Sequence, residues 1–127
     1  NQDSILDLTP LQNLRVFEIA QATGANWYGP PVYGKLKQII TDSMLSLERF
    51  SIGSIGVSKL DFTSNINLTR FHSSHEKYDS LDLSNNINLD DYQSFYNSNL
   101  VYLDLSNGNN LSCSYSSSND SNLYCIV

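Results

Sequence analysis

The chain has 127 residues, enough for one domain with a buried core. Only 16% of the residues are charged, but eight Tyr, five Phe and one Trp argue against disorder. The net charge of -6 argues against a nucleic-acid partner, because phosphate capture depends on clustered Lys and Arg. No run approaches the about 18 apolar residues that a membrane-spanning helix needs, so we expect no membrane span.

Near-identical segments recur along the chain. Leu60-Asp-Phe-Thr, Leu81-Asp-Leu-Ser and Leu103-Asp-Leu-Ser begin 21 and 22 residues apart, and each opening Leu is followed by another Leu eight residues later. The same frame fits units that open at Leu6 and Ile39. We therefore predict a single domain, 1–127, whose units open near 6, 39, 60, 81 and 103, with a truncated or capping unit over 112–127.

The first two units open 33 residues apart, because about a dozen residues are inserted between them. This insertion, at about 22–36, carries Trp27, Tyr28 and Tyr33 among Gly and Pro. Large aromatic side chains on a restricted backbone are typical binding anchors. The exposed end of a repeat array also needs an apolar cap, so the sequence leaves both roles open for the insertion.

Each unit combines a short run of alternating residues with Asn, Ser and Gly, which favour turns. Because no unit could bury its Leu residues alone, we expect the units to stack. The period and segments such as Leu47-Glu-Arg-Phe50-Ser-Ile52 resemble the leucine-rich-repeat family, and Leu-Asp-Leu-Ser-x-Asn is similar to repeats of bacterial, internalin-like surface proteins. The resemblance implies a mainly β solenoid, a right-handed coil of about five units with short strands and little helix.

Stacking would turn equivalent positions into columns of side chains. Seven residues after each opening, an inward amide could bond the backbone of neighbouring units. One residue after each opening, we favour a solvated, turn-bonded acidic column over calcium, which needs about six to eight oxygen ligands. The two columns are Asn13, Ser46, Asn67, Asn88 and Asn110, and Asp7, Ile40, Asp61, Asp82 and Asp104.

The outward positions of the Leu-x-x-Leu-x-Leu strands vary from unit to unit, and variation allows specificity. These side chains could form a structural charge ladder, since exposed pairs are worth under about 1 kcal/mol each, or they could contact a partner. Together with the aromatic insertion, the candidate partner-binding residues are Arg15, Glu18, Glu48, Arg49, Arg70, His72, Asp91, Gln93 and Tyr96.

Catalytic and metal-binding motifs are weak. His72, His75 and Glu76 suggest a metal or acid-base site, but residues on a strand and turn need not converge, and there is no third histidine. Neither a Gly-x-Ser-x-Gly elbow nor a Cys-His arrangement occurs. We therefore predict no catalytic residue, no metal and no cofactor.

Two kinds of covalent modification fit the sequence. Cys113 and Cys125 could be free thiols, but in a chain that resembles secreted proteins we favour a disulfide. Asp-Ser followed by an apolar residue resembles a bacterial periplasmic O-glycosylation acceptor, with candidates Ser4, Ser43 and Ser80. N-glycosylation patterns at Asn67, Asn110 and Asn119 are expected by chance in a chain rich in Asn and Ser.

These features predict a non-catalytic binding module that is extracellular or on the outer cell surface. Its partner would be a protein, either in simple recognition or as an accessory subunit of a larger surface complex, including a membrane-associated one. Two alternatives are a glycan-binding module, because aromatic and Asn-rich surfaces suit sugars, and a structural spacer of a larger adhesin.

Overall fold

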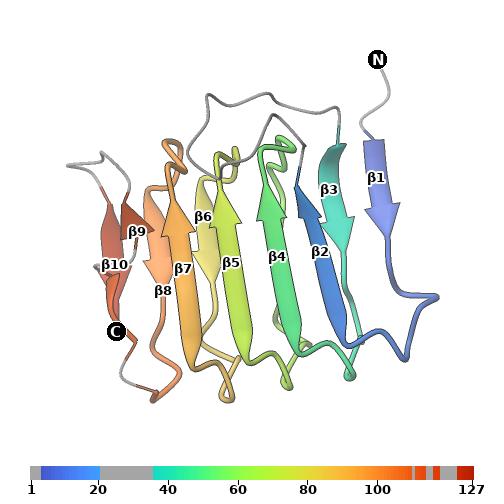
Figure 1. Ribbon diagram of the computed structural model, residues 1–127. Helices are drawn as coiled ribbons and strands as arrows, with labels where there is room; N and C mark the ends of the chain where they lie inside the picture. Colours follow the sequence, from blue (N-terminus) through green and yellow to red (C-terminus); the bar gives the residue numbers. More distant parts are fainter. Residues whose placement is uncertain (1–3, 21–35, 110, 114–115, 118–122) are drawn as a thin grey trace.

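The computed structural model describes residues 4–20, 36–109, 111–113, 116–117 and 123–127. In these residues the regular structure is β-strand, and every strand pairs in parallel with its neighbours (Figure 1). The strands are β1 (Ser4–Asp7), β2 (Val16–Ala20), β3 (Leu36–Ile40), β4 (Arg49–Gly53), β5 (Arg70–Ser74), β6 (Ser80–Asp82), β7 (Asp91–Phe95), β8 (Tyr102–Asp104), β9 (Ser116–Ser117) and β10 (Tyr124–Ile126).

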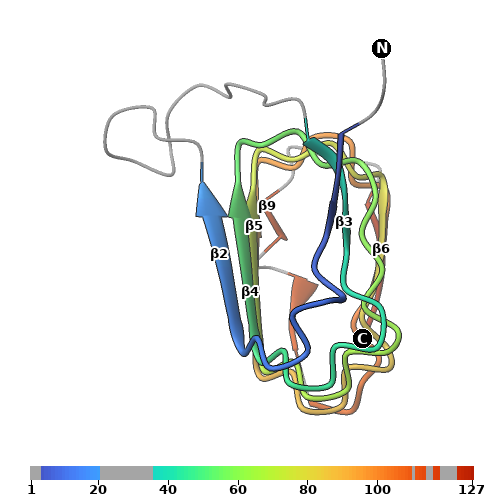
Figure 2. The ribbon, with the colours of Figure 1, turned by 90° about the vertical axis from the view of Figure 1, so that its right-hand side faces the viewer.

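The strands form two layers that face each other (Figure 2). One layer is a five-stranded sheet in the order β2-β4-β5-β7-β9. The opposite layer holds a two-stranded sheet, β1-β3, and a three-stranded sheet, β10-β8-β6. Along the chain the strands alternate between the layers for most of the length, so most pairs join strands that lie two elements apart, whereas β4 and β5 are consecutive and pair directly.

The register of the five-stranded sheet aligns equivalent residues. Phe17, Phe50, Phe71 and Tyr92 are successive register partners. Because side chains alternate between the two faces of a strand, these four rings enter the space between the layers and stack, with centroids 5.4, 5.9 and 5.9 Å apart. The three later rings are buried, and full burial of such a side chain contributes roughly 1.5–3 kcal/mol.

Opposite the aromatic column, Leu residues close the core. Leu81, Leu83, Leu103 and Leu105 are buried in and just after β6 and β8. Between the layers Tyr78 is also fully buried. Its hydroxyl lies 2.6 Å from Ser73 Oγ and 3.2 Å from Ser94 Oγ, and it accepts a hydrogen bond from Asn97. These hydrogen bonds give the buried polar groups partners, and without partners such groups would destabilise the core.

The predicted fold class is wrong. Instead of one right-handed leucine-rich-repeat coil of about five like units, the described strands form separate parallel sheets of five, three and two strands, with no helix. The second layer is interrupted between β3 and β6, where Gln38 and Lys59 form only an isolated bridge. Just before that bridge the chain bends, because Gly56 has a φ of 81° and the carboxylate of Glu76 binds the N–H groups of Ile55 and Val57.

The two polar columns have different positions. Asn67 and Asn88 donate to the backbone oxygens of Leu45 and Ile66, so they bond the preceding segment as predicted, but both are exposed rather than inward. The buried asparagines lie two residues earlier. Asn65 donates to the backbone of Thr41 and Met44, and Asn86 to that of Phe62 and Asn65.

The acidic column is bonded within its own turns. Oδ1 of each Asp accepts from the backbone N–H and the hydroxyl of the residue two positions later, at Asp7, Asp61, Asp82 and Asp104. The Thr9 and Thr63 hydroxyls, followed by their N–H groups, lower the pKa of Asp7 and Asp61. The lowered pKa favours the ionised form of Asp7 and Asp61, and the hydrogen bonds fix all four turns.

Cys113 and Cys125 form a disulfide, as predicted, with Cα atoms 6.4 Å apart. It ties the edge strand β10 to the segment before β9. Within the described residues, we find no helix that is long and apolar enough to cross a membrane.

Replacing both cysteines, Cys113→Ser with Cys125→Ser, should lower the free energy of unfolding by about 3 kcal/mol, because the crosslink restricts the unfolded chain over a separation of 12 residues. Urea unfolding followed by circular dichroism measures the difference, and reductant should bring the wild type to the stability of the variant. Equal stability of the oxidised wild type and the variant would show that the crosslink does not form in solution.

Candidate binding surface

The outer face of the five-stranded sheet carries two rows of aligned side chains. Because alternate residues of β4, β5 and β7 enter the core, the residues between them point outward. The first row contains Arg49, Arg70 and Asp91, and the second contains Ser51, His72 and Gln93. Ser51 is itself buried, so the accessible part of the second row is His72 and Gln93. On β2, Val16 and Glu18 extend the two rows.

Asp91 is the charge centre of this face. Its Oδ2 lies 2.8 Å from Arg70 Nε, and its Oδ1 lies 3.0 Å from His72 Nε2. Partial burial raises the pKa of Asp91, but contact with His72 and the Arg70 charge outweigh that effect, so the net pKa is below the ordinary value. Asp91 is therefore a carboxylate held between two side chains of the neighbouring strand.

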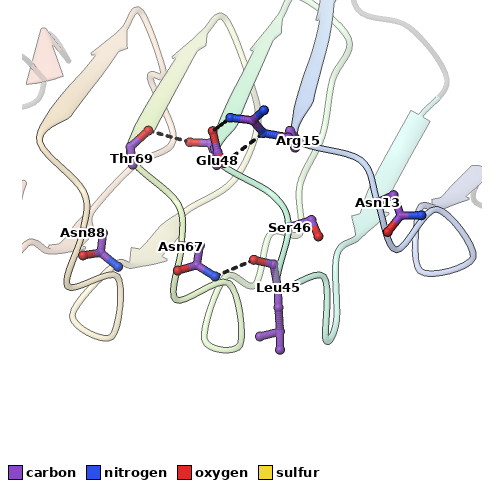
Figure 3. Close-up of a pocket in the computed structure, with 8 residues that line it drawn as sticks. All are labelled: Asn13, Arg15, Leu45, Ser46, Glu48, Asn67, Thr69 and Asn88. Atoms are coloured by element: carbon purple, nitrogen blue, oxygen red, sulfur yellow. Dashed lines mark hydrogen bonds and ion pairs between the residues drawn. The ribbon is translucent and has the colours of Figure 1, made fainter.

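A groove lies where the chain enters the five-stranded sheet (Figure 3). Its volume is about 740 Å³. On its wall, Arg15 donates to both carboxylate oxygens of Glu48, from Nε at 3.0 Å and from Nη2 at 2.9 Å. Thr69 donates to the backbone oxygen of Glu48 at 3.0 Å. The lining residues are Asn13, Arg15, Leu45, Ser46, Glu48, Asn67, Thr69 and Asn88.

A row of exposed apolar side chains runs along the turns that precede β4, β5 and β7. Leu45, Ile66 and Ile87 are 54%, 45% and 60% exposed, and each occupies the sixth position after the opening of its unit. We call this row the apolar stripe. The repeat pattern does not predict this row, although Ile66 and Ile87 each stand between two Asn residues, a turn context in which an apolar side chain is easily left outside the core.

The structure brings most of the predicted partner-binding residues together. They lie on the outer face or on the adjoining groove wall: Arg15, Glu18, Glu48, Arg49, Arg70, His72, Asp91 and Gln93. A smaller hollow of about 340 Å³ adjoins Asp91 and Gln93. Tyr96 lies elsewhere, after the end of β7, where its ring stacks on His75 at 4.9 Å. Trp27, Tyr28 and Tyr33 lie outside the described residues.

His72, His75 and Glu76 do not converge. His72 is on the outer face beside Asp91, His75 is buried against Tyr96, and Glu76 is only 1% exposed. In the part of the chain that the structure describes, no group of three or more His, Cys, Asp and Glu side chains could hold a metal ion.

The candidate O-glycosylation residues Ser4, Ser43 and Ser80 are all exposed. Ser43 has a φ of 60° in a tight turn, where its N–H donates to Ser64 Oγ. Ser4 begins β1 and Ser80 begins β6. All three side chains are therefore accessible from solvent.

Comparison of the chain with protein-family models, with curated proteins and with solved structures finds no match.

Among the buried residues that the structure describes, Glu76 is the carboxylic acid whose pKa is shifted most. Its two oxygens accept from the N–H groups of Ile55 and Val57 at 3.1 and 2.7 Å, and its own N–H donates to Asn97 Oδ1. Burial raises the pKa of Glu76 to about 7, because the backbone hydrogen bonds offset the loss of solvation only in part. The folded protein therefore keeps this proton to a higher pH than the unfolded chain does.

The stability of the fold should fall as pH rises from 4.5 to about 7, because the unfolded chain releases the Glu76 proton near 4.5 and the folded chain near 7. The interval corresponds to about 3 kcal/mol. Glu76→Gln should remove this loss. Burial lowers the pKa of His75, which acts in the opposite direction below 6.5 in both proteins, so the difference between their urea-unfolding curves isolates Glu76. Parallel pH profiles would contradict the assignment.

Proposed function

We propose that the chain is a non-catalytic module that recognises a protein partner. Three adjoining features would make the contact: the outer face of the five-stranded sheet, the groove at its start and the apolar stripe. The observation that carries the proposal is the apolar stripe. Isolated exposed apolar side chains are ordinary, but a row of three beside a polar groove is typical of interaction sites.

The composition of this surface suits a protein interface. Interfaces combine an apolar centre with a polar rim that carries hydrogen-bonding groups. Here Leu45 lines the groove together with the Arg15–Glu48 pair and the hydroxyl of Thr69. The pair and the turn hydrogen bonds hold these groups in place before any partner arrives, which lowers the entropy lost on binding.

The proposal includes an exported location, extracellular or at the outer cell surface, including a membrane-associated complex. The disulfide between Cys113 and Cys125 supports it, because disulfides persist in oxidising compartments. The exposed Ser4, Ser43 and Ser80 are compatible with modification after export. The resemblance of the sequence to the leucine-rich repeats of bacterial surface proteins points to the same setting.

The variant Ile66→Asp with Ile87→Asp should weaken partner binding at least about tenfold, because two charges would enter an apolar contact. The matched control is Val101→Asp, since Val101 is 48% exposed and lies just before β8 in the other layer. Immobilised wild type and variants would capture proteins from an extract of the source organism, and the affinity of each recovered partner would then be measured by calorimetry.

A second variant, Arg49→Glu, tests the outer face separately, because it reverses an exposed charge in the first row. Partners captured with equal affinity by the wild type and by both stripe and outer-face variants would remove this surface as the contact site.

Glycan recognition is a second candidate, favoured by one observation. The groove presents side-chain amides and hydroxyls at regular positions, from Asn13, Ser46, Asn67, Thr69 and Asn88. Asn67 and Asn88 donate to the backbone through their Nδ2 atoms, so their oxygens remain as acceptors for sugar hydroxyls.

A glycan array distinguishes the two candidates. A glycan site in the groove predicts a signal that is lost with Asn67→Ala and Asn88→Ala but retained with Ile87→Asp. Protein recognition predicts no signal above background for the wild type on the same array.

A further inference from the structure

The smaller hollow lies beside the start of β7, next to the outer face of the five-stranded sheet. Its volume is about 340 Å³. Ligand pockets in proteins measure about 300–1,000 Å³, so this hollow is at the small end of the range and fits one side chain of a partner rather than a folded segment. Its lining includes Asp90, Asp91, Gln93, Asn109, Leu111 and Ser112.

Three of the lining side chains present hydrogen-bond acceptors. Asn109 donates through Nδ2 to the backbone oxygens of Ile87 and Leu89, both at 2.7 Å, which leaves its Oδ1 as an acceptor. The Nε2 atom of Gln93 donates to Asp91 at 3.4 Å, which leaves Oε1. The ionised carboxylate of Asp90 only accepts. A ligand that satisfies these three side chains must therefore supply several donors.

The two carboxylates of the hollow differ in charge compensation. Asp91 is paired with Arg70 and His72 on the neighbouring strand. Asp90 is exposed, and among the residues that the structure describes it takes part in no ion pair. The hollow therefore carries one negative charge that no described side chain offsets, and an incoming cation would compensate it.

The charge distribution along the sequence points to the same kind of ligand. Residues 1–77 hold seven acidic residues and all seven Lys and Arg, so their formal charges cancel. Residues 78–127 hold the other six acidic residues and contain no Lys, Arg or His, so the whole net charge of -6 belongs to this part of the chain. Its field attracts a cationic group toward the hollow and disfavours an anionic one.

We propose that the hollow binds an arginine side chain of the protein partner, an inference that rests on the proposed function. A guanidinium group is planar and carries five N–H donors. Two of them can bond the carboxylate oxygens of Asp90 side by side, and the others can reach the amide oxygens of Gln93 and Asn109. The partly buried Leu111 offers an apolar contact to the methylene stem of the arginine.

The test uses a small probe, so that it does not depend on finding the partner. N-acetyl-arginine methylamide is titrated into isotope-labelled protein while amide signals are followed by NMR. The matched probe is the citrulline derivative, which has the same length but a neutral urea group in place of the guanidinium. The arginine derivative should shift the signals of residues 90–93, 109, 111 and 112 saturably, and the citrulline derivative should not. Equal shifts with both probes, or no saturable shift with either, would overturn the proposal.

A pair of variants separates the hollow from the general negative field. Asp90→Asn should weaken binding of the arginine derivative about tenfold, because a charge-assisted pair becomes a neutral contact. The matched control is Asp82→Asn, which removes the same charge from an exposed position on β6 in the opposite layer and should leave binding almost unchanged. An equal loss in both variants would show that the probe responds to net charge alone and would overturn the site.

This inference and the proposed function can fail separately. If Ile66→Asp with Ile87→Asp leaves partner capture unchanged while the arginine derivative still binds beside Asp90, the proposed partner surface fails and the guanidinium site stands. If the same double variant abolishes capture while Asp90→Asn leaves the affinity of the captured partner unchanged, the partner surface stands and the arginine contact is overturned.

Discussion

Parallel pairing in a single register is the constraint on which the rest of the structure depends. Strands of the five-stranded sheet pair with residues 21, 22 or 33 positions away, so chemically equivalent side chains are brought into line. The stacked Phe50 and Phe71 and the buried Asn65 and Asn86 result from that alignment. A shift by one residue would exchange the inner and outer faces, and the aromatic column would lose its burial.

The sequence period correctly predicts which residues align, because the aromatic and Leu positions recur at constant offsets. It does not predict where the second layer breaks. Beside that break lie contacts between residues distant in the sequence: Glu76 occupies the position that Asn97 holds in the next unit, and its carboxylate accepts from the N–H groups of Ile55 and Val57. Residue spacing alone carries no signal for such a contact. The disulfide was predictable, since the chain has only two cysteines.

Part of the candidate surface was predictable from the alternation of side chains along each strand. Alternation places Arg70, His72 and Asp91 on one face, but it does not show that Asp91 lies between the other two side chains. The groove and the apolar stripe were missed because they are formed by turns, whose side-chain directions follow from local backbone geometry rather than from a period. Leu45 and Met44 are neighbours in the sequence, yet one is exposed and the other fully buried.

The proposed recognition surface lies on one side of the molecule: the groove, the apolar stripe and the outer face of the five-stranded sheet. Amide hydrogen exchange with and without a recovered partner tests this assignment most directly. We expect slower exchange on binding over residues 45–51, 66–72 and 87–93, with no change over β6 and β8 in the opposite layer. Protection confined to β6 and β8 would contradict it.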